Sequence, residues 1–276
     1  MKKKYLTYFL IFIICAMASS ALTYSIWHLL KAHQDYEDSR DVYEEMEDDF
    51  IERPDTQDES QPDTNGGKYE YLLIDFDGLR KVNPDVIAWI DIPGAGISYP
   101  VLQGEDNSYY LTHLASGQYG ISGSIFMDYH NRPDFSDQNT IIYGHNMKDD
   151  SMFGKLNDYQ DRAIYEENPS FYIYVPGKVM KYQIFSCYAG SVSSEAYIYS
   201  FPEISDFMDF TEAIISFADY ETGVTVGETD RVSTLSTCVS SGRSYRYLVH
   251  GKLTEVSIGV QGVQTRLKRN VRFESK

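Results

Sequence analysis

The chain contains little cysteine and far less positive than negative charge. Only three cysteines occur among 276 residues. Cys15 lies inside an apolar N-terminal run, so at most Cys187 and Cys238 can pair in a soluble domain, and a disulfide framework is excluded. Lys and Arg number 24 against 41 Asp and Glu, a formal net charge of −17. Because phosphate binding needs clustered cations, this balance argues against a nucleic-acid partner.

Several motifs that would indicate metal or serine chemistry are also missing. The sequence has no Cys-x-x-Cys, no His-Glu-x-x-His and no Gly-x-Ser-x-Gly pattern. Asp149 and Asp150 are a possible calcium ligand pair, but a lone acidic pair is usually a solvated loop. No repeat appears at the periods of solenoids or propellers. We therefore expect neither a metal nor a cofactor.

One segment is long and apolar enough to cross a bilayer. Residues 5–30 carry no Asp, Glu, Lys or Arg, and three lysines precede them. Lysines in the short segment before an apolar span favour a cytoplasmic N-terminus, which places the rest of the chain outside the cell. Ala16-Met17-Ala18 would suit a cleaved signal peptide, but the apolar run continues well beyond it. We predict that residues 1–33 are a cytoplasmic tip and a single plasma-membrane anchor.

Residues 34–68 are dominated by carboxylates, Ser, Pro and Gly, with few aliphatic side chains. Such a composition buries too little apolar surface to form a core. We predict a solvated stalk here, partly helical near the membrane and loose around residues 61–67. Residues 69–276 would then form the folded domain.

The folded part is predicted to be mostly β. The 24 tyrosines of the whole chain favour strands, and Pro176-Gly177 indicates a hairpin turn. Residues 69–80 mix aliphatic and acidic side chains at a helix-like spacing, and Asn83-Pro84 suggests a helix start before residues 86–90. One or two short helices should therefore open the domain. Residues 203–220 have the 3.6-residue apolar period of an amphipathic helix. Short β-type runs occur at residues 97–102, 124–127, 140–143, 170–175, 179–189, 231–238 and 245–256. This pattern predicts a mostly antiparallel barrel or sandwich without choosing between them.

Cys238 is the candidate nucleophile because it ends a predicted strand and precedes a polar turn. A free thiol is mostly protonated at neutral pH unless a cation or base lies near it. Arg243 or Arg246 would supply that positive charge. The alternative is a buried, inert thiol, and Cys187 fits that alternative because it shares a predicted strand face with Phe185.

His145 is the histidine placed best for proton transfer. It lies in a turn directly after the predicted strand 140–143, where a scaffold commonly holds catalytic side chains. His130 and His250 remain competitors on position alone. His28 and His33 belong to the membrane anchor and its edge, and His113 has no nearby chemical group in the sequence.

Residues 234–238, Thr-Leu-Ser-Thr-Cys, resemble the strand end that carries the nucleophile of the sortases. The stretches 99–101, 125–128 and 139–147 are similar to the class B branch of that family. The resemblance covers about residues 69–256. It implies an eight-stranded β-barrel with N-terminal helices and one long helix before the nucleophile strand, a role that residues 203–220 match.

The resemblance also implies the roles of individual residues. Cys238 would be the nucleophile, His145 the proton-transfer partner, and Arg246 the charge stabiliser, since Arg243 lies inside the turn. Ser236, Thr237 and Asn146 are predicted to contact the substrate. An acidic residue that can follow the cysteine in the family is missing here, where Val-Ser-Ser occupies positions 239–241.

The implied activity is that of a membrane-anchored cysteine transpeptidase. It would cleave an Asn-Pro-x-Thr-like sorting signal of a secreted protein through a thioester, and pass the acyl group to an amine. That amine would come from a peptidoglycan precursor or from a pilin lysine. Two alternatives remain: a hydrolytic cysteine protease, and an anchored adhesion or scaffold domain with an idle cysteine.

Overall fold

Eight strands close into a barrel in the computed structural model of the chain, which describes residues 2–53, 71–239 and 244–258. Around the barrel the strands follow the order β10-β8-β7-β3-β4-β5-β6-β9. The β4–β5 and β6–β9 pairs are parallel and the others antiparallel. The strands are β3 (Val86–Ile92), β4 (Ile97–Leu102), β5 (Ile125–Met127), β6 (Asn139–Tyr143), β7 (Ser170–Val175), β8 (Lys178–Ser191), β9 (Val232–Cys238) and β10 (Tyr245–Ile258). The mostly β prediction is confirmed, and the architecture is a barrel.

Short helices connect or precede the strands. They are α2 (Phe76–Val82), η1 (Pro93–Ala95), η2 (Tyr109–Leu111), η3 (Gly154–Gln160), α3 (Arg162–Glu167) and η4 (Glu195–Tyr197). The expected helix start at Asn83-Pro84 is wrong. Asn83 instead ends α2, where its backbone N–H donates to the Leu79 carbonyl, and residues 86–92 form β3. The reason is tertiary, because β3 is covered on both faces and its Val and Ile side chains fill the barrel.

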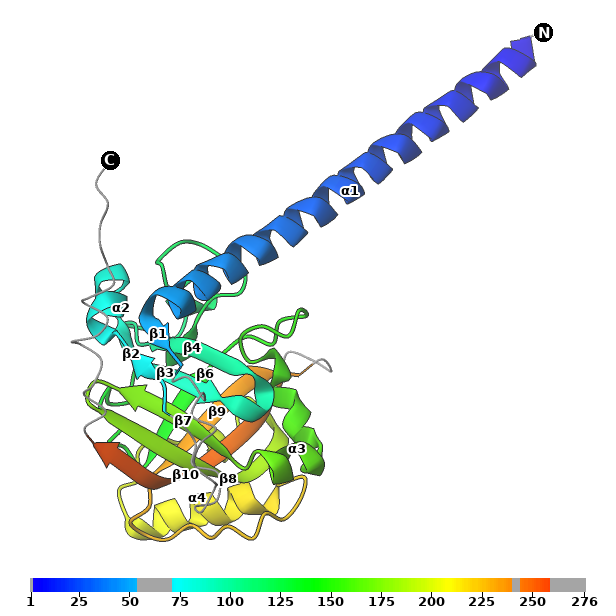
Figure 1. The fold of residues 1–276 in the computed structure, drawn as a ribbon. Helices are drawn as coiled ribbons and strands as arrows, with labels where there is room; N and C mark the ends of the chain where they lie inside the picture. Colours follow the sequence, from blue (N-terminus) through cyan, green and yellow to red (C-terminus); the bar gives the residue numbers. More distant parts are fainter. Residues whose placement is uncertain (1, 54–70, 240–243, 259–276) are drawn as a thin grey trace, which may run out of the picture.

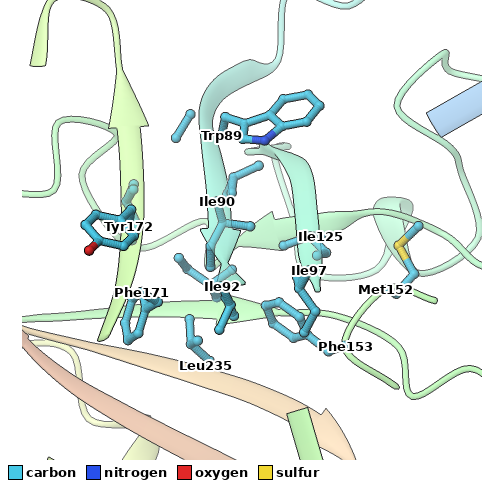
Figure 2. Close-up of a cluster of buried hydrophobic side chains, with 14 of the residues drawn as sticks. Trp89, Ile90, Ile92, Ile97, Ile125, Met152, Phe153, Phe171, Tyr172 and Leu235 are labelled. Atoms are coloured by element: carbon cyan, nitrogen blue, oxygen red, sulfur yellow. The ribbon is translucent and has the colours of Figure 1, made fainter. Parts of the chain in front are cut away.

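The barrel interior is filled by apolar side chains from several strands. Figure 2 shows Ile90 and Ile92 of β3 packed with Phe171 of β7 and Leu235 of β9. All four are fully buried. Because Leu235 lies three residues before Cys238, this packing holds the end of β9 in a fixed position.

The predicted amphipathic helix is present as α4 (Ile204–Ser216), shorter than the 203–220 pattern. It precedes β9 and covers the outer face of the barrel, at the bottom of Figure 1. Phe207, Phe210 and Ile214 pack there in a second apolar cluster with Phe185 and Leu248.

The acidic segment departs from the predicted solvated stalk. Helix α1 runs without a break over Lys2–Phe50, and its last turns pack on the barrel (Figure 1). Tyr43 and Met46 are 6% and 5% exposed. These two side chains lie with Tyr36 and Phe50 on one helix face. Many acidic residues lie between them in the sequence, so the apolar period is difficult to recognise from the sequence alone. The loose region expected at 61–67 lies outside the described residues.

Two further contacts fix α1 against the domain. The Tyr43 hydroxyl donates to the Gly123 carbonyl at 2.5 Å, and strand β1 (Ile51–Glu52) pairs with β2 (Leu73–Ile74). The other half of α1 projects away from the barrel in Figure 1. It is the one helix among the described residues that is long and apolar enough to cross a membrane.

Candidate active site

Two parallel strands bring Cys238 and His145 to the same end of the barrel. Tyr143 of β6 pairs with Ser236 of β9, and the Gly144 N–H continues the ladder to the Ser236 carbonyl at 3.1 Å. His145 lies two residues after Tyr143, just beyond β6, and Cys238 lies two residues after Ser236, at the end of β9. The parallel register therefore places an imidazole and a thiol, 93 positions apart in the sequence, next to each other.

The side chains of His145 and Cys238 form a hydrogen bond. The other contact of the imidazole is to backbone, with Nε2 lying 2.7 Å from the Leu111 carbonyl oxygen. A carbonyl only accepts, so Nε2 carries a proton. Nδ1 is then the ring atom that can take the proton of the thiol.

The pKa values of this pair shift in opposite directions. The hydrogen bond to His145 and the positive charge of Arg246 lower the pKa of Cys238, against the effect of partial burial. The hydrogen bond to Cys238, helped by the Leu111 carbonyl, raises the pKa of His145, although burial and Arg246 oppose this. Both shifts favour a thiolate beside an imidazolium.

Arg246 lies opposite Cys238 on the neighbouring strand. In the antiparallel β9–β10 ladder it is the direct partner of Cys238, and its Nη1 donates to the Tyr245 carbonyl at 2.9 Å. The side chain is half-buried. A guanidinium here keeps a permanent charge and several N–H donors beside the thiol. Arg243, the competitor in the turn, lies outside the described residues.

Asn146 holds the end of β9 in place. Its side-chain amide donates to the carbonyl of Cys238 at 2.6 Å, and its backbone forms an isolated bridge with Met152. The residue after the histidine thus fixes the backbone of the cysteine. The arrangement can activate a thiol, move a proton and stabilise a negative oxygen, which is what acyl transfer requires.

Comparison with known proteins agrees with this geometry. The family model described as the sortase domain matches residues 90–254. The chain belongs to the sortase family. It is 40% identical to Sortase B of Listeria monocytogenes over 179 residues, which cover 63% of this chain and 72% of that protein.

Solved structures give the same class. The Staphylococcus aureus sortase B–substrate complex superposes with a TM-score of 0.62 at 32% identity, covering 65% of this chain and 84% of that one. Sortase B of B. anthracis in complex with AAEK1 reaches a TM-score of 0.68 at 29% identity, over 81% and 99% of the two chains. The predicted class B resemblance is confirmed, together with the sortase barrel and a cysteine-transpeptidase family.

Two of the predicted substrate contacts are buried in this sortase. Thr237 is 1% exposed and Ser236 is 2% exposed. Alternation along β9 puts Thr237 on the inner face with Leu235, whereas Ser236 points outward with Cys238. The Ser236 hydroxyl lies 2.9 Å from the hydroxyl of Tyr197. Neither predicted hydroxyl is at the surface, whereas Asn146 is the half-buried member of the predicted set.

Two groups around the sortase site were not predicted. The Leu111 carbonyl that orients His145 is a backbone atom and leaves no signal in the sequence. Tyr197 of η4 contacts Ser236 through its hydroxyl. Besides burial, the charges of Arg246 and Cys238 contribute to the pKa shift of Tyr197. It comes from a loop about 40 residues before the nucleophile, so no local pattern connects the two.

The remaining candidates have other environments. His130 pairs with Asp128 at 2.8 Å. His250 is fully buried, with Nδ1 2.9 Å from the Thr234 hydroxyl. Cys187 is 1% exposed, and burial raises its pKa to about 12, which agrees with the inert role predicted for it. In the described part of the chain, no three His, Cys, Asp or Glu side chains are arranged to hold a metal.

Proposed function

We propose that Cys238, His145 and Arg246 carry out a class B sortase reaction on a C-terminal sorting signal. The observation that supports this most is the Cys238–His145 hydrogen bond at the end of the β6–β9 pair, with Arg246 opposite the thiol. An inert buried cysteine would have a raised pKa, as Cys187 does. Cys238 has a lowered one.

In the first step, the Cys238 thiolate attacks the carbonyl carbon of a threonine in the signal. The peptide C–N bond breaks, and the leaving amine takes a proton from the His145 imidazolium. The products are a thioester on Cys238, a neutral His145 and a released C-terminal fragment.

In the second step, an amine attacks the thioester and neutral His145 accepts its proton. The C–S bond breaks, which regenerates the thiolate and the imidazolium. Arg246 donates hydrogen bonds to the oxyanion that develops in both steps, a role that is typically worth about 3–4 kcal/mol.

The proposed substrate carries an Asn-Pro-x-Thr-like signal, and the amine belongs to a peptidoglycan precursor of the cell wall. Support for a peptide substrate comes from the similarity to the Staphylococcus aureus sortase B–substrate complex. Asn146 is proposed to set the position of the nucleophile through the Cys238 carbonyl, beside the bound signal.

We propose further that α1 anchors the enzyme as a single pass with the barrel outside the cell. The apolar half of α1 and the three lysines before it support this topology. Tethering both enzyme and substrate in one membrane raises their effective concentration.

Mass spectrometry of the acyl-enzyme tests the proposal. Incubation with an Asn-Pro-x-Thr peptide should add the mass of the N-terminal fragment to the wild-type chain and leave Cys238→Ala unchanged. Added amine should then convert the thioester into an amide product. Hydrolysis alone at every amine concentration would contradict the transpeptidase assignment and favour a protease.

A further inference from the structure

A cavity of about 570 Å³ lies between α1 and the barrel. One wall is α1, from Tyr36 to Glu47, and the opposite wall includes Tyr99 of β4 and the loop 149–152 that follows His145. Cys238, His145 and Arg246 do not line it. Its volume is within the range of small-molecule sites.

Carboxylates from two separate elements converge in this cavity. Glu44 and Glu47 come from α1, and Asp149 comes from the loop after His145. All three line the cavity together with Tyr99. Burial raises the pKa of the Tyr99 hydroxyl, and the negative charges of the three carboxylates add to this effect. The ring of Tyr99 meets that of Tyr43 edge-on at 5.3 Å. Carboxylates beside aromatic rings are a favourable environment for an ammonium group.

Ser122 provides an independent sign of a ligand. It lines the same cavity and is 3% exposed, yet its hydroxyl has no hydrogen-bond partner within the described residues. The nearby carbonyl of Gly123 and hydroxyl of Ser124 already bond to Tyr43. A buried polar group without a partner costs about 1–3 kcal/mol. A ligand that supplies a partner would recover this cost, whereas a solvated acidic surface would not leave such a group.

Positive side chains in the cavity narrow the chemistry of the ligand. Arg40 pairs with Glu44 at 3.4 Å, and Arg53 pairs with Glu47 at 2.5 Å. Lys155 also lines the cavity. A polyamine would be repelled by these three cations. A ligand with one ammonium group, together with amide or carboxylate oxygens, matches both signs of charge.

We propose that this cavity binds a short peptide carrying a free primary ammonium group. The ammonium lies among Glu44, Glu47 and Asp149, and a peptide amide or carboxylate partners Ser122. A bound peptide would connect the barrel-packed end of α1 to the loop that starts at His145 and is closed by the Asn146–Met152 bridge. The site is separate from the thiol chemistry and does not depend on it.

Calorimetry on the full chain in detergent tests this site, with Cys238→Ala as the background so that no turnover occurs. The probe is the tripeptide Ala-Lys-Ala with an acetylated N-terminus, so that the lysine side chain is its one ammonium group, and we expect saturable binding. Acetylation of the lysine side chain should weaken binding by roughly tenfold, because it removes the charge. Ser122→Ala should weaken it roughly threefold to tenfold through the lost hydrogen bond.

The controls separate binding from folding and from other sites. Ser122→Ala should not lower the melting temperature, since its hydroxyl has no partner to lose. Glu212→Gln, an exposed change on α4, should bind the tripeptide like the background chain. Absence of binding, or equal binding by the peptide acetylated on its lysine side chain or by Ser122→Ala, would overturn the proposal. Spermidine binding as tightly as the tripeptide would overturn the peptide assignment. None of these results bears on acyl-enzyme formation by the wild-type chain.

Discussion

The paired strands β9 and β10 have a partly exposed end at Cys238, called the open end here, and a buried middle, called the closed middle. The pKa values of cysteine and histidine side chains shift in opposite directions in these two places. At the open end the pKa of Cys238 is lowered and that of His145 is raised. In the closed middle, His250 pairs with Thr234 and Val249 is the partner of Cys187 on β8. There burial raises the pKa of the thiol to about 12 and lowers that of the imidazole to about 3.

The difference shows which interaction decides reactivity. Burial alone favours the neutral form of both groups, and this happens to Cys187 and His250. At the open end the thiol and the imidazole are hydrogen-bonded to one another, so each stabilises the charged form of its partner. Four changes would break or sharpen this comparison.

The largest effect is expected from removing the nucleophile. Cys238→Ala should reduce transpeptidation by roughly 10⁴-fold or more, because no other group in the site can form the thioester. Cys187→Ala should keep activity close to wild type and lose some stability through a small cavity. Product formation from a labelled signal peptide measures both. Equal losses in the two variants would contradict the assignment.

His145→Ala should reduce kcat by roughly 10²–10⁴-fold, since the leaving amine loses its proton donor. The pKa of Cys238 should also rise towards that of an ordinary thiol, because its main stabilising partner is gone. In the wild type, alkylation should slow only as pH falls through the lowered thiol pKa. In His145→Ala the slowing should begin at higher pH, as followed by mass spectrometry with Cys187→Ala as the background. An unchanged alkylation profile would show that the histidine does not activate the thiol.

Arg246→Gln should reduce kcat by about 10²–10³-fold through loss of oxyanion stabilisation. Arg246→Lys keeps the charge but not the planar donor arrangement. It should therefore retain a lowered thiol pKa in the alkylation assay while kcat stays well below wild type. If Arg246→Lys restored full turnover, charge alone would be sufficient and the donor geometry would not matter.

The smallest effect concerns the buried histidine. The Thr234 hydroxyl donates to Asn139 at 2.8 Å, so it accepts from Nδ1 of His250. Nε2 is then a buried acceptor with no partner among the described residues. The folded pKa of about 3 lies below the unfolded value of 6.5. Stability is therefore lost as pH falls below 6.5, by about 2 kcal/mol at pH 5.

His250→Gln keeps a donor for Thr234 but does not titrate in this range. Its unfolding free energy should therefore fall by about 2 kcal/mol less than that of wild type between pH 7 and pH 5. Denaturant unfolding at the two pH values measures the difference. The same loss in both proteins would mean that His250 is not the group responsible.

Much of this sortase could be predicted from short patterns. The period of residues 203–220 predicted the helix before β9, and the run ending at Cys238 identified the family and its barrel. Local patterns could not predict that β6 and β9 are parallel neighbours, because that pairing depends on how the whole sheet closes. Yet this pairing is what places His145 beside Cys238.

The errors have identifiable physical causes. Asn83-Pro84 fits the start of a helix as well as the end of one, and only the burial of β3 on both faces decides between them. Ser236 and Thr237 point to opposite sides of β9, since neighbours on a strand alternate, and their predicted substrate contacts stay a prediction. The apolar face of α1 near Tyr43 was hidden by the many carboxylates around it.

Under the membrane anchoring proposed above, the continuity of α1 would also set the distance between the catalytic domain and the membrane. With the apolar half of α1 in a bilayer, the helix between Leu30 and the barrel-packed Tyr43 spans about 20 Å at 1.5 Å per residue. A continuous helix of that length, packed on the barrel at its C-terminal end, would keep the Cys238 thiol away from the lipid surface. Client proteins would then have to present their cleavage site at a matching elevation, so the spacer between a client's own anchor and its signal becomes a criterion of selection.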